Sequence, residues 1–100
     1  MFKVGISGDL LNSSDEPCFG MAPLNLLKNR KNIEISWMDK SINELDTEMT
    51  SKFDAILLNL PKAGSNCVSG SNCKLKIISR FGVGYDTVDI DAMKKKNIIV

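Results

Sequence analysis

The chain has 100 residues, of which 43% are hydrophobic and 25% charged, and its net charge is +1. This composition is typical of one modest globular domain, and the balanced charge argues against a nucleic-acid-binding surface. No apolar run approaches the ~18 residues of a membrane span, and the N-terminus lacks the apolar core and cleavage site of a signal peptide. We therefore expect a cytoplasmic protein with neither nucleic-acid nor membrane partners.

Cysteine and histidine content narrows the chemistry further. The three cysteines, Cys18, Cys67 and Cys73, are an odd number and too sparse for a disulfide framework, which fits a reducing compartment. Histidine is absent, so a Ser-His or Cys-His nucleophile pair and a histidine-bearing zinc site are excluded within these residues. We expect no metal site, and any acid–base histidine has to come from elsewhere.

Strand and helix patterns alternate along the first half of the chain. Residues 2–6 alternate apolar and polar and end in the turn cluster 7–9. Asp9 in that cluster is interpreted as a turn residue, with an acidic ligand as the alternative. A leucine stripe that follows Pro23, over residues 23–27, predicts a short helix. Residues 33–37 alternate with period two and predict the second strand.

The second half continues the alternation. Residues 41–53 begin with the S-x-x-E form of a capping box and predict the clearest helix of the chain. The apolar run 54–60 predicts a strand covered on both faces, and residues 76–79 predict a fourth strand. A helix is predicted over 89–96, with Asp89 as its cap and lysines in its last turn. Residues 98–100 then begin a fifth strand.

This order of elements predicts an α/β fold of flavodoxin-like type, with a parallel sheet and helices on both faces. The chain stops on three apolar residues of the predicted fifth strand, which is unusual for a finished domain because a strand needs an exit loop. We therefore expect the N-terminal part of a longer, two-domain protein. A complete single domain whose last strand is terminal is the alternative.

The loop RFGVGYDTVD, residues 80–89, carries the most specific pattern. A dinucleotide fingerprint needs G-x-G-x-x-G, and here Gly82 and Gly84 fit the first two places while Thr87 stands at the third. Glycine-rich backbone at the carboxyl end of a strand is also suited to binding an anion such as a carboxylate. A tight turn that needs glycine only for its geometry is the alternative. Arg80 is expected to brace the loop or to cap a carbonyl.

The segment KLKIISRFGVGYDTVDIDAMKKKNIIV, residues 74–100, resembles the signature of the D-isomer-specific 2-hydroxyacid dehydrogenases, particularly the phosphoglycerate dehydrogenase branch. DAILLNLPK, residues 54–62, is similar to the strand that precedes this signature. The resemblance implies that residues 1–100 are the N-terminal portion of the substrate-binding (catalytic) domain. It also implies that a Rossmann cofactor domain, absent here, follows residue 100.

The resemblance implies particular site residues. In the family, backbone amides of the glycine-valine-glycine loop hold the substrate carboxylate, which carries over to Gly82, Val83 and Gly84. The strand-end Arg-Ser pair of relatives corresponds here to Asn59 and Leu60, so Asn59 is a substrate-binding candidate. That departure argues against assuming phosphoglycerate as the substrate. The family's catalytic arginine, glutamate and histidine belong to the later domain, so we expect no catalytic, cofactor-binding or metal-binding residue in this chain.

The resulting hypothesis is an NAD(P)-dependent oxidoreductase acting on a small D-2-hydroxy or 2-keto acid. The resemblance implies that NAD or NADP binds to the missing domain, that the full-length protein is a homodimer, and that residues 1–100 alone are inactive. A non-catalytic carboxylate-sensing domain and a phosphoacceptor receiver domain are the alternatives. A receiver needs an acidic pair after the first strand, where only Asp9 is present. An FMN flavodoxin is disfavoured because residues 7–14 lack a compact phosphate-binding cradle.

Overall fold

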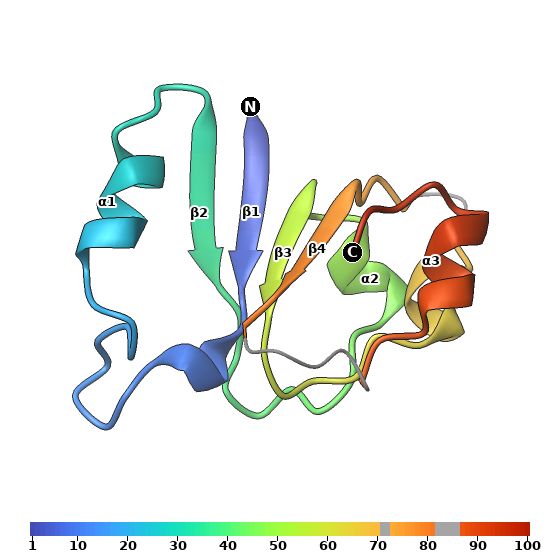
Figure 1. Ribbon diagram of the computed structural model, residues 1–100, viewed down its shortest axis with the longest axis horizontal. Helices are drawn as coiled ribbons and strands as arrows, with labels where there is room; N and C mark the ends of the chain where they lie inside the picture. The colour runs from blue at the N-terminus through green and yellow to red at the C-terminus, as the bar shows by residue number, and fades with distance from the viewer. Residues whose placement is uncertain (71–72, 82–86) are drawn as a thin grey trace.

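Four parallel strands in the order β2-β1-β3-β4 form the centre of the fold (Figure 1). The computed structural model describes residues 1–70, 73–81 and 87–100. The strands are β1 (Phe2–Ile6), β2 (Ile33–Trp37), β3 (Ala55–Leu58) and β4 (Ile77–Arg80). Ile99 forms an isolated parallel bridge with Ile77, so the predicted fifth strand lies beside β4 but is reduced to one bridge. The predicted flavodoxin-like order of a parallel α/β sheet is confirmed.

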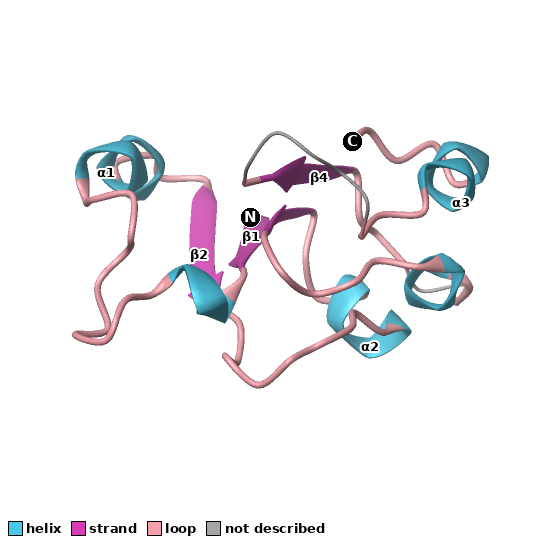
Figure 2. Cartoon of the chain, turned by 60° about the horizontal axis from the view of Figure 1, so that its bottom comes forward, coloured by secondary structure: helices cyan, strands magenta, loops and turns pink. Residues whose placement is uncertain are grey.

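Helices cover both faces of the sheet, as predicted (Figure 2). Leu24 of α1 (Ala22–Lys28) packs with Val4, Ile6 and Leu10 on one face, and the short 3-10 turn η1 (Gly8–Leu10) closes that cluster. The other face is covered by α2 (Thr47–Thr50), the 3-10 turn η2 (Ser65–Val68) and α3 (Ile90–Lys95), which surround Ile56, Leu58 and Ile78. Among the described residues, no helix has the length and apolarity needed to cross a bilayer.

The cover of the sheet is uneven, which corrects one expectation. In β3, Ile56 and Leu58 are fully buried, whereas Ala55 and Leu57 on the opposite face are only half-buried. Ile77 and Ile99, which continue that opposite face, are 36% and 66% exposed. The physical reason is the position of α1, which packs over β2. The apolar run of β3 therefore reflects full burial on one face and partial burial on the other.

The predicted helix over 41–53 is wrong for most of its length. Ser41 donates its backbone N–H and its hydroxyl to the Asp39 carboxylate, at 2.8 and 2.7 Å, so it forms an Asx-type turn and caps nothing. Leu45 N–H donates to the carbonyl of Lys62 at 2.8 Å. The helix α2 begins only at Thr47, where the Asp46 carboxylate accepts the N–H of Met49 at 2.9 Å.

The apolar residues whose spacing predicts this helix are buried or partly buried although most of the helix does not form. Leu45 is buried in the larger core cluster, and three other residues of the pattern pack against that cluster: Ile42, Met49 and Phe53. An extended strip paired with the chain after β3 and a single helical turn thus bury the same side chains. The helical period alone did not distinguish these two solutions.

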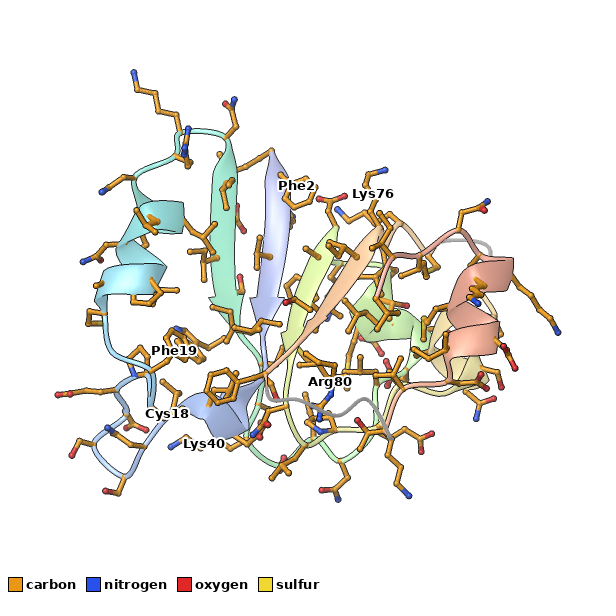
Figure 3. All side chains as sticks on the ribbon, viewed as in Figure 1. Phe2, Cys18, Phe19, Lys40, Lys76 and Arg80 are labelled. Atoms are coloured by element: carbon orange, nitrogen blue, oxygen red, sulfur yellow. The ribbon has the colours of Figure 1, made fainter. Side chains whose placement is uncertain are left out.

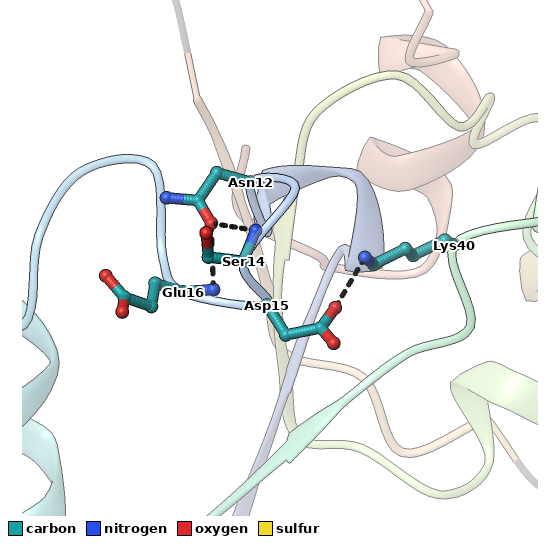
Figure 4. A network of polar contacts seen from close by, with 5 residues as sticks. All are labelled: Asn12, Ser14, Asp15, Glu16 and Lys40. Carbon is teal, nitrogen blue, oxygen red and sulfur yellow. Dashed lines mark hydrogen bonds and ion pairs between the residues drawn. The ribbon is translucent and has the colours of Figure 1, made fainter.

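The last helix and the polar loop after β1 follow from local sequence. Asp89 caps α3 by accepting the N–H of Ala92 at 3.0 Å, as predicted. The loop is organised by Asn12, whose side-chain oxygen accepts the N–H groups of Ser14 and Glu16 at 2.9 and 3.1 Å (Figure 4). Lys40 pairs with Asp15 at 2.7 Å, but both side chains are largely exposed, so this ion pair contributes little stability.

Candidate functional site

Three strand exits meet at the carboxyl edge of the sheet. They bring together five residues, which we call the carboxyl-edge cluster: Ser7, Asp9, Asn59, Leu60 and Arg80. The cluster exists because β3 lies between β1 and β4, so their ends are adjacent although they are far apart in sequence. Figure 3 shows Arg80 at the end of the sheet toward which the strand arrowheads point. Ligands of open parallel sheets bind in the crevice outside this edge.

Asp9 is the centre of the carboxyl-edge cluster. Its Oδ2 accepts the side-chain N–H of Asn59 at 2.7 Å and the backbone N–H of Leu60 at 3.2 Å. The fully buried hydroxyl of Ser7 donates to the other carboxylate oxygen. The preceding Gly8 allows this arrangement, because a Cβ there would lie 2.2 Å from the carbonyl oxygen of Met38. The turn residue predicted at Asp9 therefore also ties β1 to β3.

The electrostatics of Asp9 favour its charged form. Burial disfavours the charge and is the largest single effect, but hydrogen bonds from Ser7, Asn59 and Leu60 together outweigh it. The net result is that the pKa of Asp9 is lowered below its ordinary value of 3.8. The cluster thus contains a permanent negative charge at neutral pH, held by donors from two strand exits.

Arg80 holds the exit of β3 from the other side. Its Nη1 donates to the carbonyl oxygens of Leu58, at 3.2 Å, and of Asn59. This confirms the prediction that Arg80 caps a carbonyl. Phe81 follows, with its N–H bonded to the Leu58 carbonyl at 2.8 Å and its ring 5.9 Å from that of Phe19. The turn after β3 is therefore fixed by Asp9 and Arg80 together.

The predicted carboxylate-binding residues Gly82, Val83 and Gly84 lie outside the described residues, so their role stays a prediction. The residues on either side of them are placed: Phe81 bonds to the end of β3, and the carbonyl of Thr87 accepts the N–H of Ala63 at 2.8 Å. Asn59, the other predicted substrate-binding residue, lies in the carboxyl-edge cluster with its amide nitrogen directed to Asp9.

The N-terminus of α3 does not fit a dinucleotide pyrophosphate. Such a group needs the free N–H groups of a helix N-terminus, but the N-terminus of α3 is capped by the Asp89 carboxylate and carries Asp91 in its first turn. These two negative charges oppose a bound phosphate. In the described part of the chain, no group of three or more acidic or cysteine side chains is positioned to hold a metal ion either.

A surface cavity of about 350 Å³ lies next to Thr87. It is lined by Glu44, Lys62, Gly64, Thr87, Val88 and Asp89. Two carboxylates and one ammonium group give this cavity a net negative lining, which is unsuited to an anionic substrate. The carboxyl-edge cluster balances one carboxylate with one guanidinium group and lies at the edge where open parallel sheets bind ligands, so it is the better candidate for a functional site.

Comparison with known proteins decides the family. Residues 19–100 match the model of the D-isomer specific 2-hydroxyacid dehydrogenase catalytic domain. The chain belongs to this family. The resemblance inferred from the glycine-valine-glycine segment is thereby confirmed, and members of the family are oxidoreductases.

Similar proteins of the 2-hydroxyacid dehydrogenase family agree with this assignment. The chain is 33% identical over 81 residues to D-3-phosphoglycerate dehydrogenase 3, chloroplastic, of Arabidopsis thaliana, and 29% identical over 80 residues to a D-3-phosphoglycerate dehydrogenase of Mycobacterium bovis. These matches cover 81% and 80% of the chain but only 14% and 15% of those proteins. The chain thus spans a small part of the length of these curated relatives.

Solved structures support the fold. D-lactate dehydrogenase from Escherichia coli superposes with a TM-score of 0.65 at 19% identity, over 99% of this chain and 30% of that one. The pyruvate reductase of Chlamydomonas reinhardtii superposes with a TM-score of 0.68 at 15% identity, over 100% of this chain and 28% of that one. The sheet order and its helices are therefore those of dehydrogenase domains.

Reasoning from sequence missed the pairing at the centre of the carboxyl-edge cluster. The sequence pattern alone identifies Asp9 as a turn residue and gives Ser7 no role. A signal was available: both residues follow the first strand, Asn59 follows the third, and these strands are neighbours in a flavodoxin-like sheet. Combining the strand ends of the predicted topology would have placed the three residues together.

Proposed function

We propose that this chain is the substrate-binding part of an NAD(P)-dependent oxidoreductase that acts on a small D-2-hydroxy or 2-keto acid. Membership of the 2-hydroxyacid dehydrogenase family supports the oxidoreductase class. The relatives named D-3-phosphoglycerate dehydrogenase support a substrate that carries a carboxylate beside the reacting carbon.

The observation that carries the proposal is the location of the two residues that flank the glycine segment. Phe81 is bonded to the end of β3, and Thr87 is bonded to Ala63 just beyond it. Residues 81 and 87, which lie on either side of the glycine segment in the sequence, thus both bond to the chain at or beyond the carboxyl end of β3, the edge at which open parallel sheets bind ligands. Successive glycine-rich backbone N–H groups are suited to gripping a carboxylate there.

The chain's own residues bind and orient the substrate under this proposal. Asp9 and Arg80 bond to the β3 exit, and Asn59, whose amide nitrogen donates to Asp9, is assigned to the substrate side of this edge as part of the proposal. The chain contains no histidine, and the N-terminus of α3 does not fit a pyrophosphate. We therefore assign the nicotinamide cofactor, NAD or NADP, which supplies the hydride chemistry when bound, to another part of the full-length protein.

The test uses the full-length protein with a panel of 2-keto acids and either NADH or NADPH, followed by nicotinamide absorbance. We expect oxidation of one cofactor with at least one small 2-keto acid. No oxidation with any acid contradicts the proposal. Binding of a keto acid without cofactor oxidation indicates the carboxylate-sensing alternative instead.

A variant of the glycine segment tests the grip itself. Gly84→Val is expected to raise KM for the acid by roughly 10- to 100-fold, because one hydrogen bond to a charged group is worth about 1.5–3 kcal/mol. Affinity for the cofactor should change little. Gly64→Val is the control, because its Cβ would have its nearest neighbour at 3.9 Å, outside close contact. An unchanged KM in a stably folded Gly84→Val protein rules out the carboxylate grip.

A further inference from the structure

Part of one sheet face has no helix over it in the described part of the chain. Ala55 pairs with Ile77, and Ile77 pairs with Ile99; residues paired in this way point to the same face of the sheet. This is the face on which α1 lies, because Ala55 and Leu57 pack against the cluster that contains Leu24. We call four apolar residues of this face the open sheet face: Ala55, Leu57, Ile77 and Ile99. Helix α1 lies beside β2, away from β4, and leaves these residues without a covering helix (Figure 1).

The strand order explains why this part of the sheet is bare. From β1 to β2 the chain moves toward one edge of the sheet, whereas from β2 to β3, from β3 to β4 and from β4 to Ile99 it moves toward the other edge. Because parallel crossovers are right-handed, connections that run in opposite directions lie on opposite faces. The connection with α1 is therefore on one face, and those with α2, η2 and α3 are on the other. The connections between the described strands thus leave the open sheet face uncovered.

The open sheet face is apolar and accessible. Ile77 and Ile99 are 36% and 66% exposed, whereas Ile78, on the opposite face of β4, is fully buried. Ser79, which pairs with Leu57, is the polar residue at the carboxyl end of this face. Parallel sheets are almost always covered on both faces, and contiguous exposed apolar residues mark interaction surfaces. The open sheet face therefore has the character of a surface that another element covers.

The dimensions of the open sheet face fit one helix. From β3 to the strip at Ile99 there are two strand spacings, about 10 Å in total, and a helix with its side chains is about 10–12 Å across. Helix α1 stands beside this area as a layer of the same thickness, so it holds off a flat partner such as the sheet of a second copy. A single helix next to α1 fits this space.

We propose that an amphipathic helix of the same polypeptide, from outside residues 1–100, docks on the open sheet face in the full-length protein. The inference shares with the proposed function only the longer protein and depends on no reaction. In D-lactate dehydrogenase from Escherichia coli, the superposition covers 99% of this chain but only 30% of that structure. A protein with this sheet thus carries additional chain that can supply such a helix. The docked helix presents an apolar stripe to Leu57, Ile77 and Ile99 and its polar side to water.

Cysteine labelling of the full-length protein tests whether the open sheet face is covered. Ile99→Cys and Leu26→Cys are matched variants, because the native side chains are 66% and 73% exposed and Leu26 lies on α1, outside the open sheet face. Relative to the unfolded protein, we expect a maleimide to react with Ile99→Cys about 10-fold or more slowly than with Leu26→Cys, since a covered thiol reacts only when the cover opens. Peptide mass spectrometry separates these labels from that of the exposed native Cys18. Equal rates at the two positions overturn the inference.

Photo-cross-linking identifies what covers the open sheet face. A benzophenone amino acid in place of Ile99 is expected to cross-link to residues spaced three and four apart in one segment of the same polypeptide, outside residues 1–100. The same replacement of Ile77 serves if the first variant does not fold. A cross-link between two chains overturns the inference in favour of a second copy, and absence of any cross-link to a segment outside residues 1–100 overturns it as well. Neither experiment uses turnover, so inactivity with every keto acid overturns the proposed function and leaves this inference standing.

Discussion

Gly8 is the residue that lets η1 approach the chain after β2, and Gly8→Ala tests this packing. A Cβ at Gly8 would lie 2.2 Å from the Met38 carbonyl oxygen, 2.8 Å from the Lys40 nitrogen and 2.9 Å from the Asp39 carbonyl carbon. All three atoms belong to the backbone, so no side-chain rotation relieves the contact. To reach an ordinary separation of 3.4 Å, the two segments must move apart by about 1.2 Å.

That movement has a cost that follows from the structure. Overpacking a tight site by one carbon typically costs ~1–3 kcal/mol. Separating the segments also strains the hydrogen bond from Met38 N–H to the Ile6 carbonyl, which is 2.8 Å long and whose net worth is ~1 kcal/mol. We expect Gly8→Ala to lower the free energy of unfolding by about 2–3 kcal/mol and the melting temperature by roughly 8–20 °C.

Urea denaturation of the 100-residue chain, followed by circular dichroism, measures the effect. The matched control is Gly64→Ala, because Gly64 has an extended backbone with φ −93° and its nearest neighbour is 3.9 Å from the added Cβ. That change should be neutral or stabilising by about 0.4–1 kcal/mol. If Gly8→Ala falls within ~0.5 kcal/mol of the wild type, the close approach of η1 to residues 38–40 is refuted.

Four further predictions follow from individual residues. Asp46→Ala should destabilise the chain by about 1 kcal/mol, as loss of an N-cap does, whereas Ser41→Ala should cost less than ~0.5 kcal/mol. Equal losses of unfolding free energy in urea denaturation would indicate that Ser41 caps a helix after all. Burial raises the pKa of the Cys67 thiol to about 11, so only about one thousandth of it is thiolate at about pH 8. A disulfide reagent should therefore label the exposed Cys18 well before Cys67, and equal rates by mass spectrometry would contradict this. The folded pKa of Asp9 is lowered from 3.8, so its contribution to stability is present above pH 3.8 and is lost as the pH falls through the folded pKa. The difference in unfolding free energy between wild type and Asp9→Asn should shrink on acidification, and a constant difference would show that the carboxylate is not held as described. Finally, residues 1–100 alone should show no measurable NAD binding by calorimetry, and saturable micromolar binding would overturn the separation of substrate and cofactor sites.

Local sequence determined much of the secondary structure because its signals act over a few residues. The alternation in β1 and β2, the proline in the first turn of α1 and the Asp89 cap of α3 all operate within one turn or one strand. They need no partner from elsewhere in the chain to be recognised. The glycine-valine-glycine segment identified the family for the same reason, since its residues lie in one short stretch.

Tertiary structure determined the conformation of segments that hydrogen-bond to residues far away in the sequence. No helix begins at Ser41, because the Asp39 carboxylate accepts its N–H and its hydroxyl. The chain around Leu45 pairs with Lys62, so these backbone groups are hydrogen-bonded without a helix. The carboxyl-edge cluster formed because the strand order places β3 between β1 and β4, and this brings Asp9 to Asn59 across fifty positions of sequence. Hydrogen bonds between residues so far apart depend on how the sheet is assembled, so they follow from the strand order and not from any short-range spacing in the sequence.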